Sequence, residues 1–218
     1  MNVSSTKTKK ISILLADDHQ MLLDLWHSIF CKDDRYDICG KAVTGTIAVE
    51  MAKTKKPDIV LLDISMGPID GFEVTRLIRQ FSPSSKIIAV SKFIFPAYAK
   101  RMKALGAMGY VTKDSPADEL FSAILEVSKG NFYLCEQIQK IIQVEKKMYP
   151  DKKEGYPALT SREIEILQLI MDGLTSNQIG EKLFLSPRTI NIHRHNIFRK
   201  LNVTNVSSLI TTARSMGL

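Results

Sequence analysis

The sequence predicts an α/β domain with a doubly wound, five-stranded parallel sheet, followed by a smaller all-α domain of four helices. Two observations carry this prediction. Short apolar runs alternate with segments of helical periodicity from Lys10 to Lys129, and no strand pattern follows residue 158. Strands that alternate with helices favour a parallel sheet with helices on both faces, because each crossover lays a helix against the sheet.

Four apolar runs and one weaker segment, at 36–43, are the predicted strands of this sheet, and each is followed by a helical segment. The predicted strands are residues 11–16, 36–43, 58–62, 86–90 and 109–112. The predicted helices cover about 22–30, 47–55, 72–81 and 96–105, and a fifth begins at Pro116. In a sheet of this kind, binding sites lie beyond the carboxyl ends of the strands.

The rest of the chain divides into a linker and a helical domain. Residues 137–147 predict a further helix, and residues 149–157 are polar and interrupted by Pro and Gly, which is typical of a linker. Four short helices are then predicted near 161–172, 175–182, 187–201 and 206–216. We therefore place the domains at residues 10–131 and 158–218, with a helix-containing linker at 132–157.

The composition is that of an ordinary globular protein with a basic carboxyl-terminal end. The 218 residues are 44% hydrophobic and 24% charged, which suffices for one large or two small domains, each with its own core. The formal net charge is +7. From residue 186 onward the charged side chains are all basic: Arg188, Arg194, Arg199, Lys200 and Arg214. Such a local positive field permits a nucleic-acid partner.

Cysteine usage and apolar segment length indicate the compartment. Cys31, Cys39 and Cys135 fit neither a disulfide framework nor a CxxC metal spacing, which favours reduced thiols in a cytosolic protein. The apolar stretch at 11–16 is ended by two aspartates and is too short for a signal peptide. No apolar run approaches the roughly 20 residues that cross a bilayer. We expect a soluble, cytoplasmic protein without a membrane partner.

Polar residues gather where the predicted strands end. Asp17 and Asp18 follow the first strand, Asp63 the third, Ser91 closes the fourth and Lys113 follows the fifth. Three carboxylates at one sheet edge suit a Mg²⁺ ion, and a metal beside a carboxylate permits attack on a phosphoryl group. Lys and Ser could then hold phosphoryl oxygens. A single Asp at a strand end is usually a solvated turn or cap, but the coincidence of all five is a stronger signal.

Together with the loop at 63–71 (DISMGPIDG), these residues resemble the receiver domain of two-component response regulators, over about residues 10–130. The resemblance implies a flavodoxin-like fold and a bacterial source. It implies that Asp63 is the phosphoacceptor, assisted by Lys113 and Ser91. The implied Mg²⁺ ligands are Asp17, Asp18, Asp63 and the backbone carbonyl of Ser65. Tyr110 matches the aromatic residue that turns inward when Ser91 engages the phosphoryl group.

Two stretches depart from the family pattern. Gly67 stands where the family usually has Pro, and Pro68 comes one position later. Lys92 and then Phe93–Phe95 follow Ser91, where small or polar residues are usual. Lys92 would crowd or attract the phosphoryl group. The apolar triplet is either a partner surface or, as the favoured interpretation, packed under the neighbouring helix.

The predicted helix at 187–201 has two distinct faces. Ile190, Ile197 and Leu201 share one stripe at ~100° per residue. The opposite face carries Arg188, Asn191, Ile192, His195 and Arg199. Cations, an amide and an aliphatic side chain suit the DNA major groove. On helix composition alone, an ordinary solvated face is the favoured interpretation.

The segments 159–163 (LTSRE), 173–183 (GLTSNQIGEKL), 185–193 (LSPRTINIH) and 196–201 (NIFRKL) resemble the LuxR-type helix-turn-helix of the NarL/FixJ family. The resemblance implies that 187–201 is the recognition helix. Its implied DNA contacts are Arg188, Asn191, Ile192, His195, Arg199 and Lys200, the last two on the phosphate backbone. The family often has Lys where Asn191 and His195 stand, Ala where Gly180 stands and Arg where Val206 stands. His193 is expected to pack.

These resemblances imply a phosphorylation-controlled, DNA-binding transcription regulator rather than an enzyme. Its partners would be a sensor histidine kinase, double-stranded DNA and, when active, a second copy of itself. One alternative is a phosphatase of the haloacid-dehalogenase type, which needs a second Asp where Ser65 stands. The other is a phosphorylation-independent regulator or adaptor that uses the receiver for dimerisation or protein contact, through Phe93–Phe95.

Overall fold

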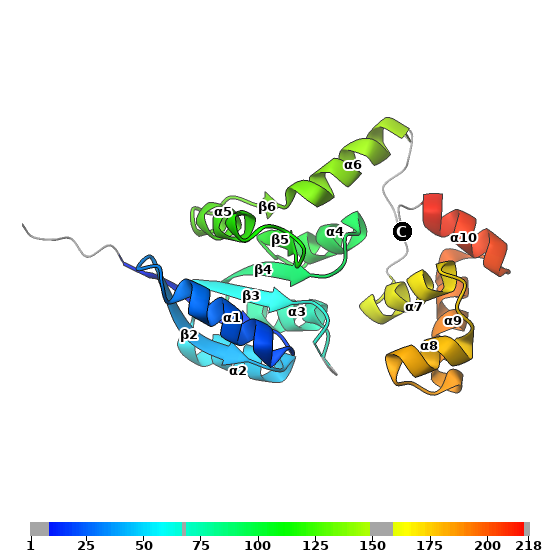
Figure 1. Ribbon diagram of the computed structural model, residues 1–218, viewed down its shortest axis with the longest axis horizontal. Coiled ribbons are helices and arrows are strands. Elements are labelled where there is room, and N and C mark those ends of the chain that lie inside the picture. The colour runs from blue at the N-terminus through cyan, green and yellow to red at the C-terminus, as the bar shows by residue number, and fades with distance from the viewer. Residues whose placement is uncertain (1–8, 67–68, 149–158, 216–218) are drawn as a thin grey trace, which may run out of the picture. The chain divides into compact units, whose positions relative to one another are not determined.

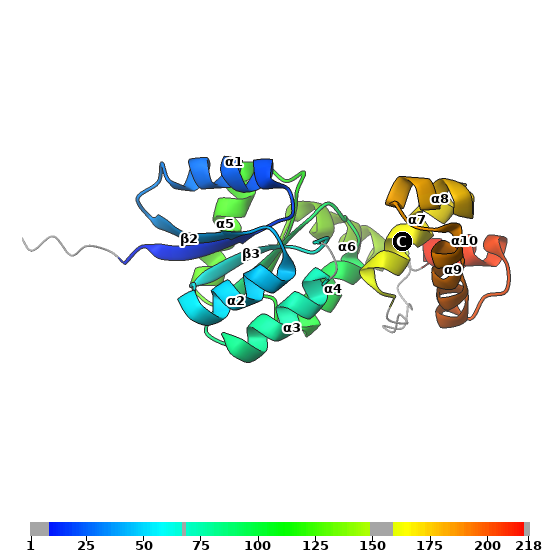
Figure 2. The same ribbon diagram turned by 90° about the horizontal axis from the view of Figure 1, so that it is seen from below.

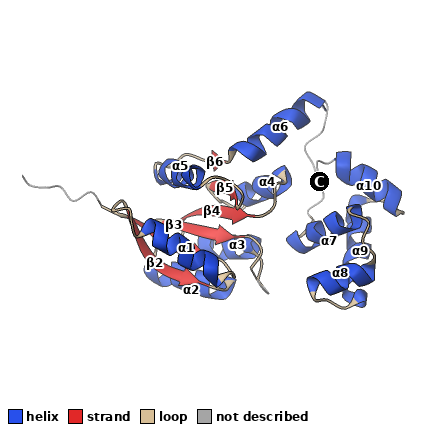
Figure 3. Cartoon of the chain, viewed as in Figure 1, coloured by secondary structure: helices blue, strands red, loops and turns tan. Residues whose placement is uncertain are grey.

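The computed structural model describes residues 9–66, 69–148 and 159–215. The chain separates into two compact units, Met1–Ile142 and Gln143–Leu218. The first unit combines a sheet with helices, and the second is helical throughout its described residues (Figures 1 and 3). The predicted order of an α/β domain followed by an all-α domain is confirmed.

The first unit is built on a six-stranded sheet of order β2-β1-β3-β4-β5-β6, in which every neighbouring pair is parallel. Its strands are β1 Ile11–Ala16, β2 Tyr36–Ala42, β3 Ile59–Asp63, β4 Lys86–Ser91, β5 Gly109–Thr112 and β6 Tyr133–Leu134. The first five agree with the predicted strands. The sixth was not predicted, because a two-residue strand is too short to show an apolar period.

Five helices cover the two faces of this sheet. They are α1 Gln20–Phe30, α2 Gly45–Lys55, α3 Gly71–Phe81, α4 Pro96–Ala104 and α5 Ala117–Ser128. Helices α2, α3 and α4 lie on one face, away from α1 (Figure 2). On the α1 face, the Phe30 ring meets Phe121 of α5 edge-on at 5.5 Å between centroids. All five residues of β3 are buried, as expected for a strand covered on both sides.

The start of α3 lies close to the end of β3. The Asp70 side chain caps this helix by accepting a hydrogen bond from the Glu73 amide at 2.9 Å. A Cβ on Gly71 would lie 2.5 Å from the Ile64 Cα and 2.9 Å from the Asp63 carbonyl oxygen. Only glycine lets α3 begin this close to the end of β3, which places Asp63 against the helix start.

The helix predicted at 137–147 is confirmed as α6, Glu136–Met148. Its first turn is attached to the sheet: the Thr112 hydroxyl hydrogen-bonds Gln137 Oε1 at 3.0 Å, and the Cys135 amide donates to the Tyr110 carbonyl. The predicted linker at 149–157 and the unusual Gly67–Pro68 pair lie outside the described residues.

The second unit contains α7 Ser161–Met171, α8 Ser176–Leu183, α9 Pro187–Leu201 and α10 Val206–Ser215. These bounds agree with the four predicted helices. Thr160 and Thr175 form capping boxes at the starts of α7 and α8, and Ser186 caps α9 ahead of Pro187. The buried core includes Ile166, Leu167, Ile179, Ile190, Ile197 and Leu209. Within the described parts of the chain, no helix combines the length and apolar character needed to cross a bilayer.

Candidate functional site

The carboxyl edge of the sheet brings two aspartates and a lysine into direct contact. Lys113 Nζ lies 2.7 Å from Asp17 Oδ2 and 2.9 Å from Asp63 Oδ2. The Asp63 side chain is 2% exposed and that of Asp17 is 8% exposed. Parallel pairing of β1 with β3, β3 with β4, and β4 with β5 produces this convergence, because each residue follows or ends a strand on the same edge.

Four side chains at this edge could hold a metal ion. Asp17, Asp18, His19 and Asp63 each offer one ligand atom, and these atoms lie within 4.8 Å of one another. Three carboxylates supply the hard oxygen donors that Mg²⁺ prefers, so the three aspartates of the predicted ligand set fit this ion. The Ser65 amide donates to Asp63 Oδ1 at 3.1 Å and holds the backbone at Ser65 next to the carboxylate.

His19 was missed by the sequence reasoning. Its Nδ1 lies 3.0 Å from Asp17 Oδ1 and 2.8 Å from Asp18 Oδ1. The Asp17 carboxylate also accepts the His19 amide at 2.9 Å, so the turn folds back on itself. The sequence signal for His19 was its position directly after the Asp17-Asp18 pair.

Burial and charge pairing have opposite effects on the pKa values of the side chains in this cluster. Burial raises the pKa of Asp63 above its ordinary value, although the Lys113 ammonium acts in the other direction. Burial lowers the pKa of Lys113, but its hydrogen bonds and attraction to Asp17 and Asp63 outweigh this, so that the Lys113 pKa is raised. Lys113 is therefore a cation in the folded protein, held between two acidic groups.

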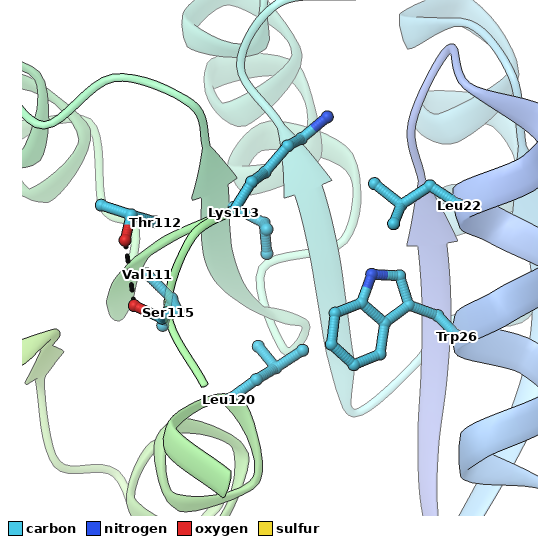
Figure 4. A pocket seen from close by; sticks show the side chains of 8 residues that line it. Leu22, Trp26, Val111, Thr112, Lys113, Ser115 and Leu120 are labelled. Atoms are coloured by element: carbon cyan, nitrogen blue, oxygen red, sulfur yellow. Dashed lines mark hydrogen bonds between the residues drawn. The ribbon is translucent and has the colours of Figure 1, made fainter. Parts of the chain in front are cut away.

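An apolar hollow lies below Lys113, between α1 and α5 (Figure 4). Leu22 and Trp26 of α1 line it opposite Leu120 of α5, and the Lys113 ammonium extends away from it. The aliphatic stem of the lysine thus borders an apolar hollow, while its charge reaches the carboxylates.

Ser91 and Tyr110 are joined through the loop that follows β4. The Phe93 amide donates to Ser91 Oγ at 3.1 Å, and the Tyr110 hydroxyl donates to the Phe93 carbonyl at 2.8 Å. Tyr110 is fully buried, and burial raises its pKa, with a hydrogen bond from Ser91 acting in the other direction. The Tyr110 side chain therefore points inward in this structure.

The unusual residues after Ser91 pack on helix α4. The Phe93 ring stacks on Tyr98 at 4.7 Å between centroids, and Phe95 lies 6.3 Å from the same ring. Both phenylalanines are half-buried, whereas Ile94 is exposed. Lys92 places its ammonium 5.3 Å from the centre of the Phe93 ring. The rings of Phe93 and Phe95 therefore pack on the neighbouring helix, as expected, whereas Ile94 does not.

In the second unit, the structure places five of the six predicted DNA-contacting residues on the exposed surface of α9. These five are Arg188, Asn191, Ile192, His195 and Arg199. His193 is half-buried, and burial lowers its pKa, which agrees with the expected packing role.

Lys200 differs from the expectation of a backbone contact. Its ammonium lies 2.6 Å from Glu163 Oε2, and the Glu163 side chain is 4% exposed. Burial raises the pKa of Glu163, but hydrogen bonds from Lys200 and Thr160 outweigh it and leave the Glu163 pKa lowered. This ion pair joins α9 to the capping box of α7. Only packing between helices reveals it, since the two residues lie far apart in the sequence.

Replacing Glu163 with Gln should destabilise the α7–α9 pair by about 1–2 kcal/mol at neutral pH. Glutamine preserves the capping-box geometry and removes the charge that Lys200 requires. Because the folded pKa of Glu163 is lowered from 4.5, its stabilisation is present above that pH and is lost as the pH falls through the folded value. Hydrogen exchange of α7 and α9 amides in the full chain measures the difference.

Glu165→Gln is the matched control, since Glu165 forms its ion pair with Arg162 within α7. A smaller effect is expected from it. Equal exchange rates in Glu163→Gln and the unmodified protein at pH 7 would show that the interhelical ion pair contributes nothing.

A doubly wound parallel sheet with a carboxylate–lysine cluster at its carboxyl edge, followed by a helix-turn-helix unit, defines a receiver domain joined to a DNA-binding domain. Comparison with protein families agrees. Residues 13–125 match the response regulator receiver domain, and residues 157–213 match the bacterial regulatory proteins of the luxR family.

Curated relatives match this chain along almost its whole length. The chain is 35% identical over 210 residues to the response regulator UvrY of Escherichia coli, covering 95% of both proteins. It is 34% identical over 207 residues to the transcriptional regulatory protein DesR of Bacillus subtilis, covering 95% of this chain and 98% of the relative. This chain therefore belongs to the LuxR-type response regulators of two-component systems.

Solved structures show the same fold. RcsB of Salmonella typhimurium matches with a TM-score of 0.61 at 23% identity, over 95% of this chain and 99% of RcsB. A LuxR-family response regulator from Aurantimonas sp. SI85-9A1 matches with a TM-score of 0.61 at 28% identity, over 64% of this chain and 99% of that one.

Proposed function

We propose that Asp63 accepts a phosphoryl group from a sensor histidine kinase and that this event controls DNA binding by α9. The observation that carries the proposal is the contact of Lys113 with both Asp17 and Asp63. The buried Asp63 carboxylate can act as the anionic nucleophile, and the fixed Lys113 ammonium provides a positive charge for the incoming phosphoryl oxygens. The relatives are named as response regulators and transcriptional regulatory proteins, which supports the same function.

In the transfer step, an Asp63 carboxylate oxygen forms a bond to phosphorus. The bond between phosphorus and the kinase imidazole nitrogen breaks, and its electron pair returns to the ring. Lys113 then exchanges part of its contact with Asp63 for a phosphoryl oxygen. Ser91 provides a hydroxyl on the neighbouring strand that can hydrogen-bond a second oxygen.

Mg²⁺ would be held by Asp17, Asp18, Asp63 and the Ser65 backbone carbonyl, and it would neutralise charge on the transferring oxygens. Asp17 is the better fixed of the first two aspartates, since it contacts Lys113 and the His19 amide. Asp18 is more exposed, at 38% of its side chain.

The switch would pass from Ser91 to the loop after β4. The loop holds Ser91 through the Phe93 amide and Tyr110 through the Phe93 carbonyl. A Ser91 hydroxyl drawn towards a phosphoryl oxygen would therefore pull on the segment that leads into α4. Movement of this segment would favour homodimerisation in the bacterial cytoplasm, as in other switches that bias a two-state element.

DNA binding would use the exposed side of α9. Arg188 and Arg199 would contact phosphates, and Asn191, Ile192 and His195 would face bases in the major groove. Lys200 is committed to Glu163, so we assign it a structural role in the free protein. In a dimer, two copies of α9 would enter successive major grooves about one helical turn apart.

Alanine at Asn191 or His195 should weaken binding to a specific duplex by roughly tenfold, as expected for loss of a base contact. The duplex is selected by the unmodified protein from a random-sequence pool in the presence of beryllofluoride. Binding is then measured with and without beryllofluoride for each variant. Thr211→Ala on the exposed surface of α10 serves as the control. Unchanged affinity in both α9 variants would exclude the proposed base contacts.

A further inference from the structure

A hydrogen bond between the two helices of the helix-turn-helix fixes one of the proposed base-reading residues. The Ser176 hydroxyl, on α8, donates to Asn191 Oδ1, on α9, at 2.8 Å. Ser176 is half-buried, and Asn191 is exposed. The amide that faces solvent on α9 is thus held by a residue on the helix that precedes it.

Both ends of this hydrogen bond are held in place locally. Ser176 is the first residue of α8, directly after Thr175, whose hydroxyl accepts the Gln178 amide and whose amide donates to Gln178 Oε1 at 2.9 Å. Asn191 lies in the first turns of α9, which the Ser186 cap and buried Ile190 fix.

The turn between the helices also keeps them close. The Leu185 amide donates to the Gly180 carbonyl at 2.9 Å. A Cβ on Gly180 would lie 2.7 Å from the Leu185 carbonyl oxygen, so glycine allows the end of α8 to approach the start of α9. The replacement of the usual Ala by Gly180 therefore has a packing reason, and it brings the α8 and α9 side chains within reach of each other.

We infer that Ser176 is a positioning residue that sets the base preference of Asn191 by occupying its amide oxygen. The inference rests on the proposed DNA-reading role of α9 and extends it to a specific donor and acceptor pattern. The Ser176 hydroxyl takes one of the two lone pairs of Oδ1 and fixes the orientation of the amide, while the NH₂ group keeps both of its donors available.

This pattern selects among base edges in the major groove. Bidentate recognition of adenine needs Asn to accept from N6 and donate to N7 at the same time. In an Asn whose oxygen already accepts one hydrogen bond and whose amide is fixed by it, the two NH₂ donors are more available than the remaining lone pair. The complementary edges are acceptors: O6 and N7 of guanine, or O4 of thymine. Asn191 therefore prefers guanine or thymine over adenine at the base that it contacts.

The test compares base preferences of the full chain with beryllofluoride. The unmodified protein and Ser176→Ala, Ser176→Thr and Asn191→Ala each select from a random duplex pool, and the base contacted by residue 191 is the one whose preference Asn191→Ala loses. Ser176→Ala frees the amide oxygen, so preference at that base should move towards adenine by roughly two- to tenfold, the range of one hydrogen bond. Ser176→Thr keeps a hydroxyl and should retain the original preference.

A double variant separates positioning from folding. In the Asn191→Ala background, Ser176→Ala should leave the base preference unchanged, because no amide remains to be positioned. Circular dichroism melts confirm that each variant is folded. Selection of a specific sequence by the unmodified protein, with the same preference at this base in Ser176→Ala, would overturn the inference alone. Failure of the unmodified protein to enrich any sequence would overturn the proposed function as well.

Discussion

Asp63→Asn is expected to abolish incorporation of phosphate from radiolabelled acetyl phosphate, whereas the unmodified protein becomes labelled. The amide has nearly the size of the carboxylate, but it lacks the anionic oxygen that attacks phosphorus. Burial raises the pKa of Asp63, and Lys113 opposes this effect, so the anion depends on its lysine partner. The substitution therefore removes the nucleophile without leaving a large cavity.

Asp114→Asn is the matched control for this experiment. Asp114 directly follows Lys113 in the sequence, but its side chain is exposed, and it is not among the four residues whose ligand atoms cluster. It should retain full labelling. Stoichiometric labelling of Asp63→Asn would show that another residue accepts the phosphoryl group, and peptide mapping would locate that residue.

The sequence predicted strands β1, β3, β4 and β5 most clearly, because they are mainly apolar and lie in the interior of a parallel sheet. Strand β2 lies at the sheet edge and contains Asp37, Gly40 and Lys41, so its apolar pattern is weaker. All residues of β3 and nearly all of β4 are buried, so no polar residue interrupts the pattern. Strand β6 escaped prediction for the opposite reason. It consists of Tyr133 and Leu134 only, both half-buried, and it forms because β5 offers an unpaired edge.

The candidate site was predictable to the extent that topology alone brings residues together. Strand ends placed Asp17, Asp63 and Lys113 at one edge before any distance was known. Interactions that depend on how helices pack were not accessible in this way. Neither the Lys200–Glu163 ion pair nor the Ser176–Asn191 hydrogen bond has a sequence period, since each joins two separate helices.

Lys113→Met is expected to destabilise the receiver domain by about 2–4 kcal/mol in buffer without divalent cations. Methionine retains most of the apolar stem that borders the hollow lined by Leu22 and Leu120, so the loss reflects the missing charge. Asp17 and Asp63 would then face each other with side chains 8% and 2% exposed and no ammonium between them. Urea unfolding in EDTA, followed by the fluorescence of Trp26, measures the change.

Lys41→Met provides the control, because Lys41 pairs with Asp24 at a solvent-exposed position and its removal should have a much smaller effect. Mg²⁺ separates the two variants further. Loss of the ammonium makes the aspartate cluster more negative, so Lys113→Met should bind Mg²⁺ more tightly and recover more stability on its addition than the unmodified protein. The same variant should be labelled by acetyl phosphate more slowly, since no cation receives the phosphoryl oxygens.

If Lys113→Met and Lys41→Met unfolded at the same urea concentration in EDTA, the lysine would not be balancing the buried carboxylates. The electrostatic basis assigned to the pocket would then be wrong.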